Sequence, residues 1–397
     1  MEQFEYNRRI RAMKPSASIA LMARAKDMQK TDPTVIGLAA GEPDFPTPDR
    51  ICMEAVRALA EGYTHYTMGP GLPELRARIR EKLARDNGIR CETGDILVTP
   101  GGKNAIFLAV NALLNPGDEA IILDPSWVSY EPIVLSAGGV PVHVRLDYRE
   151  SYRITREALE AAVSPRAKML IINYPNNPTG RVLSSQEADI LEEFLLAHPQ
   201  IVLLSDEVYE RILFDGNETV SMASRERLRE RVVTVNGFSK CVAMTGWRLG
   251  YLAAGKAFME PIYKLHQHSA SCVSGFIQRA AIVALDCRQE MEEMRRIYQV
   301  RRDLFVSKLN DIPGVRCESP AGAFYAWATF DFPGMDSNAI CTYLMDHAGV
   351  VGMPGSEYGE MQVSSMRFSF ANATEDMARA GDQIKTALLK LRAIRPN

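Results

Sequence analysis

The sequence predicts an α/β fold whose central sheet is mostly parallel and covered by helices. Apolar runs typical of strands buried on both faces occur at 95–99, 120–123, 168–172, 201–204 and 232–235. Helical stretches separate several of these runs, and a polar cluster follows each of them. Because open α/β sheets bind ligands at the carboxyl ends of their strands, these clusters predict one site at one edge of the sheet.

The length of 397 residues exceeds what one hydrophobic core usually serves, so we expect two domains. Residues 1–48 are expected to form an N-terminal arm and part of a small domain. The repeated strand and helix pattern assigns residues 49–287 to a large domain. From residue 288 a long charged helix, strands near 322–330 and 364–370, and a last helix predict a smaller α+β domain over 288–397.

Local signals delimit the helices in chain order. A short helix is expected near 18–29, and a glycine turn at 101–102 opens another. Residues with known preferences for helix ends mark four more boundaries: Gly62 as a stop, Pro73 in a first turn, Ser184 with Glu187 as a capping box, and Thr374 as an N-cap.

Composition argues against several classes of function. A net charge of -3 provides no basic surface for nucleic acid or an anionic membrane, and no apolar run approaches the roughly 20 residues of a membrane span. Seven cysteines without a C-x-x-C pair predict reduced thiols and a cytoplasmic protein. The six histidines have no acidic or cysteine partner at ligand spacing, so we expect no metal site.

The stretch VVTVNGFSKCVAMTGWR, residues 232–248, places Lys240 just past a buried strand. There the amine can be desolvated, which lowers its pKa and makes it a usable nucleophile or base. Arg248 offers a planar, permanently charged guanidinium whose N–H groups can bind phosphate or carboxylate. A loop lysine and a surface arginine are the ordinary alternative, and the residues at the other strand ends decide against it.

The other strand ends supply matching groups. Gly102 and Lys103 open a helix, which gives either an anion site or a plain turn. Asp206 follows an apolar strand, so its carboxylate either points into the crevice toward a cation or caps a helix. Trp127 either stacks on a flat ring or belongs to the core. Asn177 in PNNPTG either faces the site or holds a turn.

Arg367 shares one strand face with Ser369, and this face is either solvent or the crevice, where the arginine could bind a carboxylate bidentately. Together, an amine nucleophile, an anion-binding helix start, a buried carboxylate, an aromatic ring and spare arginines match the needs of pyridoxal phosphate. Dinucleotide binding and serine hydrolysis fit worse, because no G-x-G-x-x-G follows a strand and no G-x-S-x-G is present.

The motifs AGEPDF, YTMGPGLPELR, GGK, YPNNPTG, SDEVY, SKCVAMTGWRLGY and GAFY occur in this order. With them the sequence resembles the class I/II pyridoxal-phosphate aminotransferases of the aspartate aminotransferase superfamily (fold type I) over nearly its full length. The resemblance implies that Lys240 forms the Schiff base and moves the proton between the substrate's Cα and the cofactor's C4′. It also implies that Asp206 pairs with the pyridinium nitrogen, and that Tyr209 and Asn177 hydrogen-bond the 3′ oxygen.

The same resemblance implies roles for the remaining site residues. It gives Trp127 contacts with the cofactor ring and the substrate. The phosphate would be held by Arg248, Ser239, the backbone at Gly102 and Lys103, and Tyr66 of the neighbouring subunit, which implies a homodimer with shared sites. The α-carboxylate would be held by Arg367, assisted by Gly41 and Asn177.

Two positions depart from the family pattern. Gly237 stands where many relatives have a phosphate-binding serine. The stretch HQHSASCVSGF holds Gln267 and His268 where aspartate-type members have an arginine that reads the substrate side chain. This second departure counts against a dicarboxylate substrate, although other subgroups read acidic side chains differently.

The expected function is transfer of the amino group of an α-amino acid to a 2-oxo acid by a ping-pong mechanism. One alternative keeps the cofactor in a β-lyase or synthase of the same fold, because the orientation of the scissile bond selects the reaction. Another is a non-catalytic sensor built on an aminotransferase-like domain, which the negative net charge and the short arm argue against. The substrate side chain and the preferred oxo acid stay open.

Overall fold

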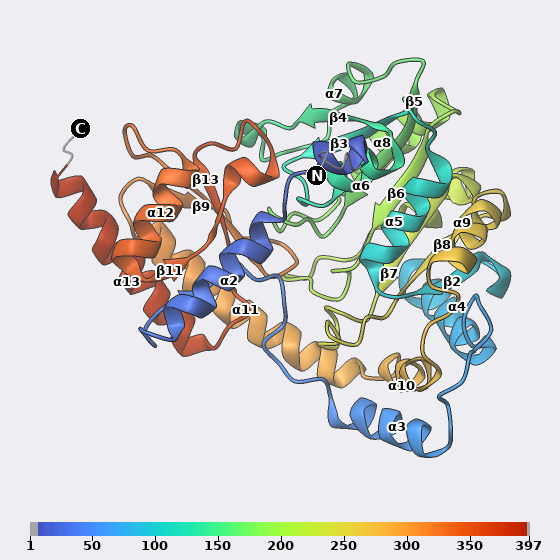
Figure 1. Ribbon diagram of the computed structural model, residues 1–397. Helices are drawn as coiled ribbons and strands as arrows, with labels where there is room; N and C mark the ends of the chain where they lie inside the picture. The colour runs from blue at the N-terminus through green and yellow to red at the C-terminus, as the bar shows by residue number, and fades with distance from the viewer. Residues whose placement is uncertain (1–6, 395–397) are drawn as a thin grey trace, which may run out of the picture.

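The computed structural model describes residues 7–394, so the outer ends of the predicted arm and small domain, residues 1–6 and 395–397, lie outside the described part. A seven-stranded sheet and a four-stranded sheet organise the described residues (Figure 1). None of the helices in this part combines the length and the hydropathy that a membrane span requires. Nor do these residues contain a group of three or more His, Cys, Asp or Glu side chains that could hold a metal ion.

The large sheet confirms the mostly parallel α/β architecture. Its strand order is β2-β8-β7-β6-β5-β3-β4, and only β8 runs antiparallel to its neighbours. In sequence order the strands are β2 (Ile96–Thr99), β3 (Glu119–Asp124), β4 (Val140–Arg145), β5 (Ala167–Asn173), β6 (Val202–Asp206), β7 (Val232–Gly237) and β8 (Gly250–Ala254).

Successive residues of each central strand face two different cores, which is why the runs are continuously apolar. In β3, Ile121 packs toward one core and Ile122 toward the other. The first core includes α4 (Pro73–Asn87), α8 (Ser185–Ala197) and α10 (Gly275–Ala284), and the second includes α5 (Gly102–Leu113), α6 (Tyr130–Ala137) and α9 (Lys256–Ser269).

Two strands of this sheet were not predicted from the sequence. β4 is one of the two edge strands and only Val144 in it is buried, so it lacks a continuous apolar run. β8 reads GYLAA, and its small residues permit a close approach to the start of α5. A Cβ on Gly250 would lie 2.5 Å from the backbone nitrogen of Gly102.

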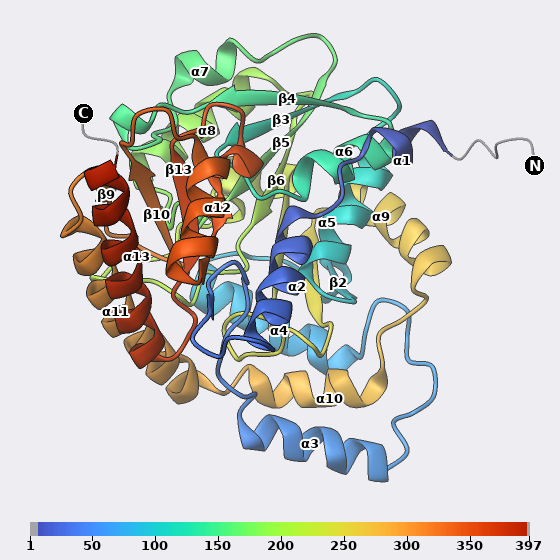
Figure 2. The ribbon, with the colours of Figure 1, turned by 60° about the vertical axis from the view of Figure 1, so that its left-hand side comes forward.

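The second sheet is antiparallel and contains β9 (Val315–Cys317), β10 (Tyr325–Phe330), β12 (Met353–Pro354) and β13 (Ser365–Ser369). It packs with α11 (Arg288–Asn310), α12 (Ser337–Ala348) and α13 (Thr374–Ile394) (Figure 2). The N-terminal segment joins this part of the chain, because β1 (Ile36–Gly37) pairs with β11 (Val350–Val351). The domain boundaries at 48/49 and 287/288 remain predictions.

Most of the expected helix ends are where the sequence placed them. Ser184 and Glu187 form the capping box of α8, and Pro73 is in the first turn of α4. Thr374 was expected to be an N-cap but is the first residue of α13 itself, so that boundary was wrong by one residue. The other helices are α1 (Arg8–Ala12), α2 (Ala17–Gln29), α3 (Asp49–Ala60), which ends just before Gly62, and α7 (Arg156–Glu160).

Candidate active site

A cavity of about 330 Å³ lies at the carboxyl ends of β5, β6 and β7, the edge at which the sequence predicted a site. The four-stranded sheet contributes Tyr325 and Arg367 to its wall, and Ser18 and Met22 contribute from α2, which crosses between the two sheets (Figures 1 and 2). Of the predicted site residues, all but Tyr66 line this cavity: Gly41, Gly102, Lys103, Trp127, Asn177, Asp206, Tyr209, Ser239, Lys240, Arg248 and Arg367.

Lys240 reaches from the segment after β7 across the cavity toward the loop that carries Gly41. Its Nζ donates a hydrogen bond to the carbonyl oxygen of Gly41 and lies 5.9 Å from the ring centroid of Phe324. Burial lowers the pKa of Lys240 to about 8, and among the nearby charges that of Glu42 opposes this shift most strongly. At pH 7 about a tenth of the amine is therefore neutral and able to act as a nucleophile or base.

Asp206 ends β6 and is buried, at 5% exposed. The Tyr130 hydroxyl donates to its Oδ2 at 2.8 Å, and the backbone N–H of Val208 donates to its Oδ1 at 3.3 Å. Burial raises the pKa of Asp206 to about 6, although both hydrogen bonds and the charge of Lys240 lower it. The carboxylate is mostly ionised at pH 7 and suits a cationic partner in the cavity. A turn, not a helix, follows Asp206, which removes the capping alternative.

Buried polar side chains fix the turn after Asp206. Glu207 accepts hydrogen bonds from Ser205 at 3.0 Å and from Ser221 at 2.5 Å. Glu210, one residue past Tyr209, pairs with the buried ammonium of Lys82 on α4. Glu207 and Glu210 do not line the cavity, and their contacts fix the turn that carries Asp206 and Tyr209.

The N-terminus of α5 forms a cup for an anion. Gly101 has a φ of +88°, and a Cβ there would lie 2.6 Å from Nη2 of Arg248. Glycine at this position therefore lets the guanidinium approach the free N–H groups at the start of the helix. Arg248 is itself held by a hydrogen bond from Nη1 to the carbonyl oxygen of Thr245 at 2.6 Å, and Ser239 lines the same cavity.

Gly237, the first departure from the family pattern, has a packing explanation. A Cβ on Gly237 would lie 3.1 Å from Cα of Gly250 and 3.2 Å from the carbonyl oxygen of Leu249. The close approach of β7 to the start of β8 therefore favours glycine over serine at this position.

Arg367 lies on β13 and is only 3% exposed, so its strand face belongs to the cavity and not to solvent. Its Nη1 donates to Oδ1 of Asn177 at 2.9 Å, and its Nη2 donates to the carbonyl oxygen of Ala39 at 2.6 Å. Its guanidinium carbon lies 4.3 Å from the ring centroid of Tyr325. A buried, oriented guanidinium in a cavity is suited to binding a carboxylate.

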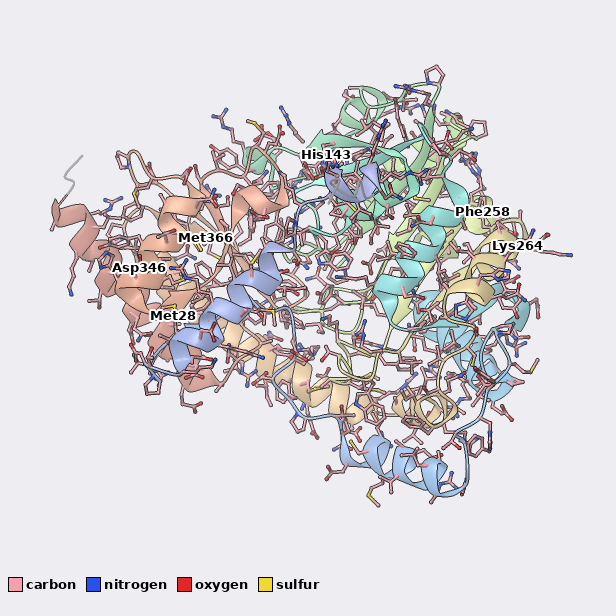
Figure 3. The ribbon with its side chains drawn as sticks, viewed as in Figure 1. Met28, His143, Phe258, Lys264, Asp346 and Met366 are labelled. Carbon is pink, nitrogen blue, oxygen red and sulfur yellow. The ribbon has the colours of Figure 1, made fainter. Side chains whose placement is uncertain are left out.

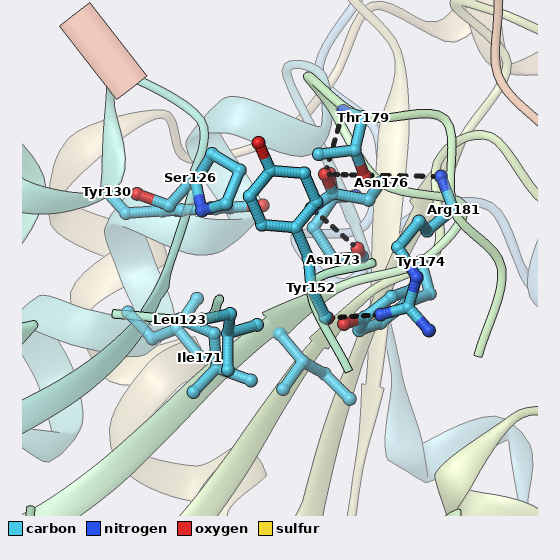
Figure 4. A pocket seen from close by; sticks show the side chains of 13 residues that line it. Leu123, Ser126, Tyr130, Tyr152, Ile171, Asn173, Tyr174, Asn176, Thr179 and Arg181 are labelled. Atoms are coloured by element: carbon cyan, nitrogen blue, oxygen red, sulfur yellow. Dashed lines mark hydrogen bonds between the residues drawn. The ribbon is translucent and has the colours of Figure 1, made fainter. Parts of the chain in front are cut away.

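The turn that carries Asn177 is held by its own side chains, several of which line a small enclosed pocket next to the cavity (Figure 4). Oδ1 of Asn176 accepts hydrogen bonds from the backbone N–H of Thr179 at 3.0 Å and from its hydroxyl at 2.7 Å. The Arg181 guanidinium donates to the carbonyl oxygen of Tyr152. Asn177 thus both holds a turn and faces the site.

Lys103 and Trp127 lie together on another side of the cavity, with Nζ of Lys103 4.8 Å from the ring centroid of Trp127. Burial lowers the pKa of Lys103, and the charge of Arg248 lowers it further. Within residues 7–394 no carboxylate forms an ion pair with Lys103, so this cation is available to a ligand.

Sequence reasoning missed several cavity residues. Tyr130 does not line the cavity itself but donates a hydrogen bond to Asp206. It follows Trp127 by three residues, a spacing that could have placed both on one helical turn. Tyr325 lies within the GAFY motif, and its hydroxyl is 2.7 Å from that of Tyr209. Glu42 lies within the AGEPDF motif and also lines the cavity, whereas no sequence signal pointed to Tyr358.

The lowered pKa of Lys240 predicts how the cofactor-free protein reacts with an acylating reagent. Because only the neutral amine reacts, acetylation of Lys240 should accelerate up to about pH 8 and then level off, whereas ordinary lysines titrate near 10.4. Lys264, which projects from α9 into solvent (Figure 3), provides an internal control. Brief acetylation across this pH range, followed by peptide mass spectrometry, measures both residues, and parallel profiles would contradict the expected shift.

Comparison with known proteins identifies the family. Residues 33–381 match the model of aminotransferase class I and II. The chain is 39% identical to an aspartate aminotransferase of Musicola paradisiaca, with 96% of each chain covered. It is 40% identical to an aspartate/prephenate aminotransferase of Cereibacter sphaeroides, with 94% of this chain and 96% of the relative covered.

A solved structure agrees with these sequence relatives. The structure of the Thermus thermophilus aspartate aminotransferase with maleate superimposes with a TM-score of 0.92 at 36% identity, covering 97% of this chain and 100% of that one. Because both the family model and the relatives extend over nearly the whole chain, this protein belongs to the class I and II aminotransferases and is an aminotransferase.

Proposed function

We propose that this aminotransferase uses pyridoxal phosphate held by Lys240 and Asp206, and that its substrates are acidic amino acids and their 2-oxo acids. The observation that supports this most is the convergence of the Lys240 amine, the Asp206 carboxylate and the Arg367 guanidinium on one cavity. Each lies at the end of a different strand or on the second sheet, so no single local motif accounts for their meeting.

The residues present fit this cofactor. Gly101 leaves space that a Cβ would fill, so the start of α5, Arg248 and Ser239 can accept a phosphate. Asp206 is positioned to pair with a protonated ring nitrogen, and Trp127 offers a flat face beside it. When bound, pyridoxal phosphate supplies an aldehyde that bonds to amines and an electron-poor ring that withdraws electrons from the substrate's Cα.

Three side chains of the protein then have separate roles in the reaction. Lys240 provides an amine that is partly neutral near pH 7, so it can bond to the cofactor and can accept and return the proton at the substrate's Cα. Asp206 keeps its negative charge in a buried place and thereby favours a protonated partner. Arg367 orients the substrate through its carboxylate, while Asn177 holds the guanidinium in place.

Lys103 supports the choice of an acidic substrate. Arg367 can bind one carboxylate, and Lys103 is a second cation in the same cavity with no acidic partner among the described residues. A substrate with two carboxylates would satisfy both. This proposal agrees with the relatives named as aspartate aminotransferases and with the Thermus structure, which contains the dicarboxylate maleate.

A homodimer is also proposed. Tyr66 is 92% exposed, and α3 exposes Met53 and Val56 on its surface. A second copy of the chain that covers this region would bury these apolar groups and could bring Tyr66 to the anion site at the start of α5 in its partner. The family resemblance supports the same arrangement.

Replacement of the nucleophile tests the core of the proposal. Lys240→Ala should abolish transamination because it removes both the amine that bonds to the cofactor and the proton carrier, while the fold should persist. Formation of 2-oxo acid from an amino acid measures the effect, with Lys264→Ala as the matched control. Near-normal turnover by Lys240→Ala would refute the assignment, and ammonia release by the native enzyme would favour the lyase alternative.

Replacement of the second cation tests the substrate class. Lys103→Met keeps the length of the side chain and removes its charge, so kcat/KM for aspartate and glutamate should fall by about tenfold or more, the range of a lost charge-assisted hydrogen bond. For alanine or phenylalanine the ratio should change little. If acidic and neutral substrates lose activity equally, Lys103 acts on the cofactor and not on the substrate side chain.

Complementation tests the shared site. Lys240→Ala and Tyr66→Ala subunits, co-expressed with different tags and purified as hybrids, should regain one intact site per dimer, with Lys240 from one chain and Tyr66 from the other. Activity of the hybrid should therefore exceed that of either variant alone. A monomer in sedimentation equilibrium, or a hybrid no more active than its Tyr66→Ala half, would exclude shared sites.

A further inference from the structure

Tyr358 is a buried residue of the cavity whose hydroxyl has no partner. It lies at the end of a short turn of 3-10 helix, Gly355–Tyr358, and is 1% exposed. It lines the same cavity as Lys240 and Arg367. Its hydroxyl oxygen makes no hydrogen bond to any residue in the described part of the chain, and neither does Nε of Arg367. A buried polar atom without a partner is costly, so an unpaired hydroxyl in a ligand cavity points to a ligand.

The ring of Tyr358 is held in a fixed orientation. It packs edge-to-face against Trp327, with centroids 5.5 Å apart, and the guanidinium carbon of Arg367 lies 5.2 Å from its centroid. Its carbonyl oxygen accepts a hydrogen bond from the backbone N–H of Ser126 at 2.9 Å, which ties the turn to the segment after β3. Phenylalanine would make the same ring contacts, so packing alone does not require the hydroxyl.

The electrostatic surroundings make this hydroxyl a hydrogen-bond donor. Burial raises the pKa of Tyr358, so the hydroxyl keeps its proton at neutral pH, although the charge of Arg367 opposes this shift. The neighbouring Tyr325 hydroxyl is already paired with that of Tyr209. Tyr358 therefore offers a free donor within electrostatic reach of a buried cation, a combination that suits an anionic acceptor.

We propose that Tyr358 is a substrate-binding residue whose hydroxyl donates a hydrogen bond to the carboxylate that Arg367 binds. This inference rests on the proposed function and adds a residue to it. Two guanidinium nitrogens of Arg367 already donate hydrogen bonds, Nη1 to Asn177 and Nη2 to the carbonyl oxygen of Ala39. A neutral donor beside the guanidinium adds a contact to the carboxylate without adding a second charge. The contact is made equally to amino acid and 2-oxo acid, since both carry this carboxylate.

The test is Tyr358→Phe in the enzyme loaded with its cofactor, because this change removes one oxygen and keeps the ring. KM for the amino acid and for the 2-oxo acid should each rise about tenfold, the effect of losing one hydrogen bond to a charged group, with kcat changed less than about twofold. Maleate, the dicarboxylate in the Thermus structure, has no amino or oxo group to react, and its inhibition constant should rise by a similar factor. The absorbance spectrum of the bound cofactor should stay as in the native enzyme.

Tyr298→Phe is the matched control. Tyr298 is also fully buried with an unpaired hydroxyl, but it packs against Phe45 and Phe324 and is not among the residues that line the cavity. Its replacement should leave both KM values unchanged. Unchanged KM for Tyr358→Phe in an active enzyme, or equal increases in both variants, would overturn the inference. A native protein with no transaminase activity would instead overturn the proposed function.

Discussion

The site depends on burying one amine and one carboxyl in the same cavity at one edge of a mostly parallel sheet. Burial lowers the pKa of Lys240 and raises that of Asp206, so both pKa values move toward 7. The amine becomes partly neutral, as a nucleophile must be, while the carboxylate stays mostly charged because Tyr130 and Val208 donate hydrogen bonds to it. In water the amine would be almost fully protonated at pH 7, because an unperturbed lysine has a pKa of about 10.4.

The rest of the fold supplies what these two groups cannot. The start of α5 with Arg248 offers an anion site at the same sheet edge. Gly101 is favoured there because its φ of +88° is one that residues with a side chain rarely adopt. The second sheet contributes Arg367, which reaches the cavity from a strand more than one hundred residues away in the sequence. The N-terminal segment connects the smaller part of the chain to the site, because β1 pairs with β11 and the carbonyl oxygen of Gly41 accepts a hydrogen bond from Lys240.

Strand patterns could predict the central sheet and the sheet edge that carries the cavity, whereas Gly41, Ser239 and Tyr209 were predicted only from the family resemblance. A strand buried on both faces must be continuously apolar, and parallel strands bring their carboxyl ends together, so Asp206, Asn177 and Lys240 had to meet. β4 escaped detection because most of its residues are exposed or half-buried, and β8 because it consists largely of small residues. Tyr358 could not be found because only tertiary packing brings its turn to Arg367.

The central claim is that the amine of Lys240 is the group that bonds to the cofactor. The most direct measurement is reduction of the purified protein, supplied with pyridoxal phosphate, by borohydride, followed by peptide mass spectrometry. The account predicts that the pyridoxyl group is found on the peptide that contains Lys240 and that it is absent when an amino acid substrate is added first. An unmodified Lys240, or a pyridoxyl group on another lysine such as Lys103, would contradict it.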